Sequence, residues 1–363
     1  MTRIRMLALA VALGTAAPAA AQIDPQTALV ERAAWNALNA GQAHAAAEGF
    51  RAALQADPKN ARLHLGAGMA AALERRDADA KDAFERAIAL DPKLAQARAL
   101  LGQIQHRMGD TFGAMRTYEA LLELAPDDRE ARATLERWRR ESELHDRMQQ
   151  AVGAHFTVSF EGPAEADLAA EALEVLDRAY WRIGQLLATY PVDPIPVVLY
   201  TTEQFRDITR SPSWAAGAYD GTIRVPMRGA LEKKEELDRV LSHEFTHALI
   251  RTLAPRGVPA WLNEGLATAL ETGDLGWADG VMQKVDGKVP LRALQSGFGR
   301  FSGAQATVAY AASALAARRL LDEAGGTAIT NLLRDLGEGA DFDAAFLHRM
   351  QRSFADFQSA AVY

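Results

Sequence analysis

Small and apolar residues recur with a period of 34 positions in the first part of the chain. This spacing relates Pro58, Pro92 and Pro126, then Phe50, Phe84 and Tyr118, and also Ala46, Ala80 and Ala114. Such a period predicts a helix-turn-helix unit, in which small residues let paired helices approach and the aromatic residue packs onto the next unit. A proline closes each unit because it fits a loop or a first helical turn but not a helix interior.

Three of these units are expected over about residues 27 to 128. The first carries Ala34 where the later units have Gly68 and Gly102, so we expect its first helix to pack differently. From Arg129 to Gln150 charged residues are interrupted by apolar ones at helical spacing, which is typical of a solvent-facing helix that caps a solenoid. The pattern therefore predicts an all-α repeat domain with its capping helix over residues 22–150.

The pattern changes after Ala154, where strands and helices mix. Alternation predicts a strand at residues 156–160, an apolar run predicts a buried strand at 195–200, and Asp220-Gly221 predicts a hairpin turn. Amphipathic segments predict helices at about 164–189, 232–253 and 259–271, and three more after residue 304. The fold class is therefore α+β, with a mostly helical second domain over residues 151–363 that contains a small β-sheet.

The first 21 residues have the pattern of a secretory signal peptide. Arg3 and Arg5 precede an apolar run from Met6 to about Ala17, and small residues follow before Gln22. The run is shorter than the roughly 20 apolar residues of a membrane span, although an uncleaved anchor is the alternative. We expect a periplasmic or secreted protein with no integral membrane span after signal cleavage.

Composition narrows the classes of partner. The 363 residues are 49% hydrophobic and 24% charged, which suits two globular domains, and the absence of cysteine excludes disulfides. Loss of Arg3 and Arg5 with the signal peptide leaves 38 basic residues against 47 acidic ones. Nucleic acid is a poor partner for so acidic a chain.

The chemistry is concentrated in the segment from His243 to His247, which reads His-Glu-Phe-Thr-His. Residues four apart lie on one face of a helix, so both imidazoles can face one metal ion with Glu244 beside them. A catalytic zinc usually takes three protein ligands and leaves one position for water. Glu264 is the candidate third ligand, because an antiparallel helix after a proline-bounded turn would return it to the level of the histidines.

Two other acidic residues, Glu271 and Asp274, follow in the same region. Glu271 lies nearly two helical turns beyond Glu264, about 10 Å at 1.5 Å per residue, whereas a carboxylate binds zinc at about 2 Å. Glu271 can at best orient a ligand. Zinc held by two imidazoles and one carboxylate activates water, and Glu244 beside it can act as general base, which predicts peptide hydrolysis.

This metal motif, together with Asn-Glu-Gly at 263–265, resembles the gluzincin branch of zinc peptidases, particularly the bacterial peptidase-MA-like domains. These domains are often joined to tetratricopeptide repeats, which the 34-residue units resemble. Over residues 155–355 the resemblance implies a zincin-like metallopeptidase fold, with Zn2+ bound by His243, His247 and Glu264 and with Glu244 as base. It also implies that Tyr310 donates a hydrogen bond to the oxyanion; a buried aromatic with a satisfied hydroxyl is the alternative.

Two departures from related peptidases limit what the resemblance implies. Thermolysin-like enzymes carry, four residues after the third ligand, an aspartate that orients a zinc histidine, and Thr268 stands there in this chain. The glycine-methionine-glutamate-asparagine signature of the large aminopeptidases is also missing. The expected partners are a peptide or protein substrate and a protein bound by the repeats. The alternative is an inactive repeat scaffold or envelope assembly factor with a zinc-stabilised second domain.

Overall fold

The computed structural model describes residues 25–162, 165–201, 218–219, 221–226, 234–271, 274–285, 289–295, 297–298 and 301–359. It divides the chain into two compact units, the first ending at Ser142 and the second beginning at Glu143. The predicted signal peptide and Asp220 of the predicted hairpin turn lie outside the described residues. Within the described residues no helix has both the length and the apolar character needed to cross a membrane.

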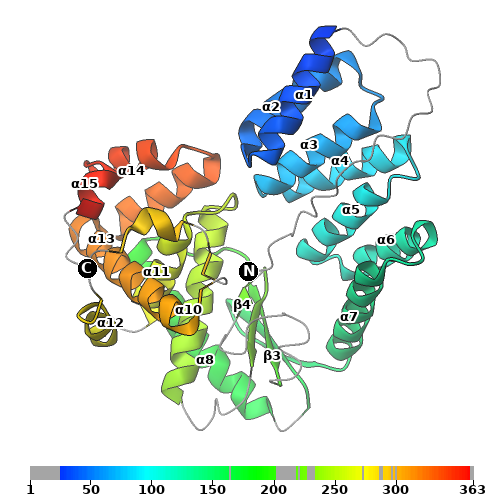
Figure 1. Ribbon diagram of the computed structural model, residues 1–363. Helices are drawn as coiled ribbons and strands as arrows, with labels where there is room; N and C mark the ends of the chain where they lie inside the picture. The colour runs from blue at the N-terminus through cyan, green and yellow to red at the C-terminus, as the bar shows by residue number, and fades with distance from the viewer. Residues whose placement is uncertain are drawn as a thin grey trace. The chain divides into compact units, whose positions relative to one another are not determined.

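The described part of the first unit is built from helices that pack in series, and Figure 1 shows them as a row of antiparallel pairs. They are α1 (Pro25–Asn39), α2 (Ala43–Ala56), α3 (Ala61–Leu73), α4 (Asp77–Leu90), α5 (Ala95–Arg107), α6 (Thr111–Leu124) and α7 (Arg129–His145), whose last residues belong to the second unit. Each helix from α1 to α6 contacts the next one along the chain. This arrangement is the one that the 34-residue period predicts.

Close contacts between glycines and aromatic rings explain the period. A Cβ atom on Gly68 would lie 2.6 Å from the ring of Phe84, and one on Gly102 would lie 2.5 Å from the ring of Tyr118. The ring of Phe50 in α2 lies over Gly66 of α3, the first helix of the next unit. Because real Cβ atoms do not approach a ring so closely, glycine is the residue that lets these helices pack.

The turns between units share a contact that the sequence pattern did not predict. Six residues after each repeated proline a side chain donates a hydrogen bond to that proline's carbonyl oxygen: His64 to Pro58, Arg98 to Pro92 and Arg132 to Pro126. The donors are themselves 34 residues apart. They satisfy carbonyl groups that the helices leave without a partner at each turn.

A five-stranded sheet forms one part of the second unit. Its described strands are β1 (Gln149–Val152), β2 (Phe156–Phe160), β3 (Ile195–Tyr200), β4 (Ala218–Tyr219) and β5 (Ile223–Pro226), in the order β1-β2-β3-β5-β4. Strands β2, β3 and β5 are parallel, and the outer pairs β1–β2 and β4–β5 are antiparallel. The antiparallel pairing of β4 with β5 is the predicted hairpin.

The capping helix is shorter than the sequence pattern predicts. The pattern predicts a capping helix to about Gln150, but α7 ends at His145 and Gln149 already pairs with Phe160 of β2. Hydrogen bonding to a neighbouring strand outweighs the local helical preference of this charged segment. The edge strand β1 is therefore an element that sequence reasoning missed.

The remaining elements of the second unit are helical. They are α8 (Ala166–Leu187), α10 (Lys234–Leu253), α11 (Ala260–Glu271), α12 (Gly276–Met282), a short 3-10 helix (Leu291–Leu294), α13 (Gly303–Glu338), α14 (Phe342–Met350) and α15 (Phe354–Ser359). The predicted break at Gly325-Gly326 is a kink within α13, where Gly325 has φ 76°. Helix α8 packs against both β2 and α10.

Helix α11 is buried along its whole length. It packs between α10 and α13, and a Cβ atom on Gly265 would lie only 2.3 Å from the carbonyl oxygen of Ser313 in α13. Such a central helix is normally apolar all round, yet α11 carries Glu264 and Glu271 into the interior. These two carboxylates need partners, and the partners define the candidate site.

The glycine contacts of the first unit give a direct test of the repeat packing. Gly68→Leu places a side chain where the ring of Phe84 already lies, so we expect the free energy of unfolding of the repeats to fall by about 1–3 kcal/mol. Arg86→Leu, at an exposed position of α4, is the control and should change it by less than about 0.5 kcal/mol. Urea unfolding of the full chain, followed by circular dichroism, measures both; equal effects would contradict the packing.

Candidate metal centre

Helix α10 presents both histidines of the motif on one face. Its other side is fixed in the core by buried residues that include Leu241, Phe245 and Leu249. Phe245 packs edge-on against Phe156 of β2, with ring centroids 5.5 Å apart. With the helix held in this register, the Nε2 atoms of His243 and His247 lie 3.1 Å apart.

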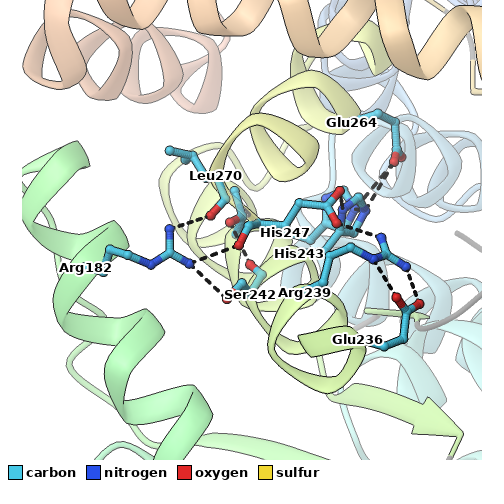
Figure 2. Close-up of polar contacts among 10 residues, drawn as sticks. Arg182, Glu236, Arg239, Ser242, His243, His247, Glu264 and Leu270 are labelled. Atoms are coloured by element: carbon cyan, nitrogen blue, oxygen red, sulfur yellow. Dashed lines mark hydrogen bonds and ion pairs between the residues drawn. The ribbon is translucent and has the colours of Figure 1, made fainter. Parts of the chain in front are cut away.

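The third predicted ligand lies opposite the two imidazoles. The Oε2 atom of Glu264 is 3.7 Å from Nε2 of His243 and 3.6 Å from Nε2 of His247 (Figure 2). Three ligand atoms bound to one tetrahedral zinc at about 2.0–2.1 Å would be about 3.4 Å from one another. The two helices therefore bring the three predicted ligands to the separations that one small cation requires.

Carboxylates dominate the electrostatics of the centre. Burial disfavours a charged His243, but its contacts with Glu264 and Glu271 and the charge of Glu244 outweigh burial and raise its pKa to about 10. Burial acts to raise the pKa of Glu264, yet the two histidines hold it well below its ordinary value. The centre thus attracts positive charge, which a proton or a metal cation can supply.

The donor set fits a divalent metal. Two imidazole nitrogens and one carboxylate oxygen are a common zinc set, and both histidine Nδ1 atoms lack a hydrogen bond among the described residues. The side chains of His243, His247 and Glu264 keep 16%, 11% and 12% of their surface exposed. One side of the centre is therefore reachable by water or by a ligand.

Glu244 lies between the two histidines in sequence and is 5% exposed. Its Oε2 atom is buried and has no hydrogen-bond partner among the described residues. Burial, opposed by the nearby histidines, raises the pKa of this carboxyl above its ordinary value. A carboxylate that is desolvated and not otherwise engaged has the properties of a general base.

Tyr310 reaches the same centre from α13. Its ring packs edge-on against Phe298, with centroids 5.2 Å apart. Burial raises the pKa of its hydroxyl, and the charge of Glu264 and a hydrogen bond to that carboxylate raise it further. The hydroxyl therefore stays protonated and can donate a hydrogen bond beside the candidate ligands.

The other acidic residues of the region have different surroundings. The Oδ1 atom of Asp274 accepts a hydrogen bond from the backbone of Gly276 at the start of α12, at 2.7 Å. Thr268 is buried, and its hydroxyl has no hydrogen-bond partner among the described residues. Glu271, by contrast, lies with Oε1 3.4 Å from Nδ1 of His243, so it and not residue 268 faces the back of a candidate ligand.

Sequence reasoning missed two arginines near the centre. Arg239, one helical turn before His243, donates to Oε2 of Glu271 at 2.6 Å. Arg182 of α8 donates to the carbonyl oxygen of Leu270 at 2.7 Å and to the hydroxyl of Ser242 at 3.0 Å (Figure 2). The four-residue spacing places Arg239 on the same helix face as His243, which could have indicated its position near the centre. A single arginine in an amphipathic helix such as α8 gives no such indication for Arg182.

Residues 71–138 match the model of the tetratricopeptide repeat family. The solved structure of the first such domain of Spaghetti (RPAP3), bound to an HSP90 peptide, is 22% identical and has a TM-score of 0.32. The similarity covers 34% of this chain and 99% of that chain. The Arabidopsis OM64 tetratricopeptide domain is 17% identical, with 32% and 95% covered and a TM-score of 0.31.

No curated protein matches the chain. The family match extends from the end of α3 into α7 and thus lies within the first unit. It confirms the prediction of helical repeats in the N-terminal part of the protein, which therefore carries tetratricopeptide repeats.

Proposed function

We propose that the second unit is a zinc-dependent peptidase in which His243, His247 and Glu264 hold the metal. The observation that carries this proposal is the position of the Glu264 carboxylate, 3.6–3.7 Å from both Nε2 atoms. The three ionisable side chains converge on a mostly buried point, where a charged group is costly unless a cation or a hydrogen-bond donor meets it. The fit of the donor set to zinc supports the same conclusion.

The chain's own residues supply the proton transfers of the proposed reaction. A zinc ion in such a centre acidifies water and polarises a carbonyl group. Glu244, desolvated and without a hydrogen bond on Oε2, takes the proton of the attacking water and passes it to the leaving amine. The protonated hydroxyl of Tyr310 donates to the oxyanion that forms at the scissile carbonyl.

An edge strand near the metal helix can present a substrate. In the described sheet β4 is the last strand on one side and packs against α10. An extended peptide can add to such an edge through main-chain hydrogen bonds, and its side chains then set specificity. This is a route by which a polypeptide, rather than a small amide, becomes the substrate.

The repeats complete the proposal as a recruiting surface for a protein substrate or partner. Stacked helical pairs form an extended surface suited to a peptide segment, and this use fits the family match over residues 71–138. The first 21 residues, read as a signal peptide, favour action in the periplasm or outside the cell.

A scaffold is the second candidate function, and the family match favours it because that match concerns the repeats alone. In this alternative the repeats bind a partner, and the second unit is an inactive or metal-stabilised module. Using the parent and Glu244→Gln as bait separates the two candidates. If the protein is a peptidase, Glu244→Gln captures an intact protein that the parent degrades. If it is a scaffold, both baits capture the same intact partner.

The first prediction for the centre concerns the base. Glu244→Gln keeps the shape of the side chain but removes its ability to accept a proton, so peptide hydrolysis should fall by about 100-fold to 10,000-fold. Zinc content, measured by atomic emission, should stay that of the parent. A variant that cleaves a casein or gelatin substrate at the parent's rate would contradict the proposed mechanism.

The second prediction concerns the third ligand. Glu264→Ala should lower zinc affinity by more than about 100-fold, because a direct metal bond is lost. Loss of a residue that only orients a ligand lowers metal affinity by roughly 10-fold to 100-fold. Asp274→Ala is the matched control, since that carboxylate accepts a hydrogen bond from the backbone of α12 instead. Competition with a chromophoric chelator gives both affinities; an equal loss in the two variants would require a different ligand set.

A further inference from the structure

The imidazole of His243 lies between two carboxylates of the same helix. Glu264 and Glu271 are seven residues apart in α11, which is close to two turns, so both project from one face of that helix. Nε2 of His243 faces Glu264 at 3.7 Å, and Nδ1 faces Glu271 at 3.4 Å. The two glutamates thus lie next to different nitrogens of the same imidazole ring.

The carboxylate of Glu271 is held in place by an arginine. Its Oε2 atom accepts a hydrogen bond from Arg239 at 2.6 Å, which leaves Oε1 directed toward His243. Arg239 is itself fixed by Glu236, which accepts hydrogen bonds from its Nε at 3.0 Å and its Nη2 at 2.5 Å (Figure 2). This fork restricts the guanidinium group and, through it, the rotamer of Glu271.

The backbone of Glu271 is also anchored. Arg182 donates to the carbonyl oxygens of Leu270 and Glu271, at 2.7 and 3.4 Å, and Arg318 donates to that of Ala269 at 2.6 Å. These arginines satisfy carbonyl groups at a buried helix C-terminus, where positive charge is also favoured by the helix dipole. Arg182 comes from α8 and Arg318 from α13, so two neighbouring helices hold the C-terminal end of α11.

From this arrangement we propose that Glu271 is the positioning carboxylate of the metal centre, acting through His243. It accepts the Nδ1–H of the ring and so fixes the tautomer whose Nε2 lone pair faces the ligand position beside Glu264. The separation of 3.4 Å is longer than an ordinary N–H···O hydrogen bond of about 2.9 Å. The ring therefore needs only a small shift toward Glu271 when Nε2 binds a cation.

This role rests on the proposed metal site, and it is the one that the sequence analysis left open for Glu271. Thr268 stands four residues after Glu264, and its hydroxyl has no partner among the described residues. Glu271, three residues further along α11, supplies the negatively charged carboxylate that Thr268 lacks. The inference also makes the histidines unequal: a carboxylate, that of Glu271, lies 3.4 Å from Nδ1 of His243, whereas the ion pair found for His247 in the described part of the chain is formed by its Nε2.

The test compares Glu271 with Asp274, a carboxylate three residues further along the chain. Glu271→Gln removes the charge that faces His243, whereas Asp274→Asn changes a carboxylate that accepts a hydrogen bond from the backbone of Gly276. Zinc affinity of the full chain, measured by chelator competition, should fall about 10-fold to 100-fold in Glu271→Gln and stay at the parent value in Asp274→Asn. Thermal unfolding of the metal-free proteins shows whether either variant only weakens the fold.

A second measurement uses the parent protein and does not depend on any variant folding. In zinc-loaded protein labelled with 15N-histidine, NMR should show His243 bound through Nε2 and protonated on Nδ1; zinc bound through Nδ1 overturns the inference. Equal zinc affinities of the parent and Glu271→Gln overturn it too, while the proposed peptidase survives. A parent that binds no zinc overturns both.

Discussion

The second unit depends on the pairing of ionisable faces on two packed helices, α10 and the fully buried α11. Helix α11 has no exposed residue, so the carboxylates of Glu264 and Glu271 lose most of their hydration on folding. Such groups persist only when cations or hydrogen-bond donors meet them. Helix α10 provides these in antiparallel order: Arg239 and His243 face Glu271, and His243 and His247 face Glu264.

This pairing explains why the centre is suited to a cation. The carboxylates of Glu244, Glu264 and Glu271 are buried, and the half-exposed guanidinium group of Arg239 pairs with that of Glu271. Without a metal, a proton on the imidazole offsets the excess of negative charge, which is why the pKa of His243 rises to about 10 despite burial. A divalent ion bound to the neutral imidazoles would offset the same excess of negative charge. The packing of the two helices therefore favours the binding of a cation.

The first unit follows a different physical rule. Its helices pack with neighbours in sequence, and the repeat is set by contacts of a glycine with an aromatic ring, such as Gly68 with Phe84. Stability in such an array is distributed over similar local interfaces. Helical repeats and a charged candidate metal centre can coexist in one chain because neither packing scheme requires the other.

Local patterns in the sequence are enough to predict the repeats, most of the strands and helices, and which side chains converge at the candidate centre. These features depend on local spacing: a 34-residue period, alternation in Phe156–Phe160, and histidines four apart on a helix. Local spacing could not reveal β1, because Gln149–Val152 becomes a strand only through pairing with β2. Nor could it show that Glu271 and not Thr268 lies behind His243, since that depends on the register between α10 and α11. Arg182 of α8 bridges these two helices, because it donates both to Ser242 of α10 and to the carbonyl oxygen of Leu270 in α11. Such contacts join residues that are far apart along the chain, so they exist only once the chain has folded.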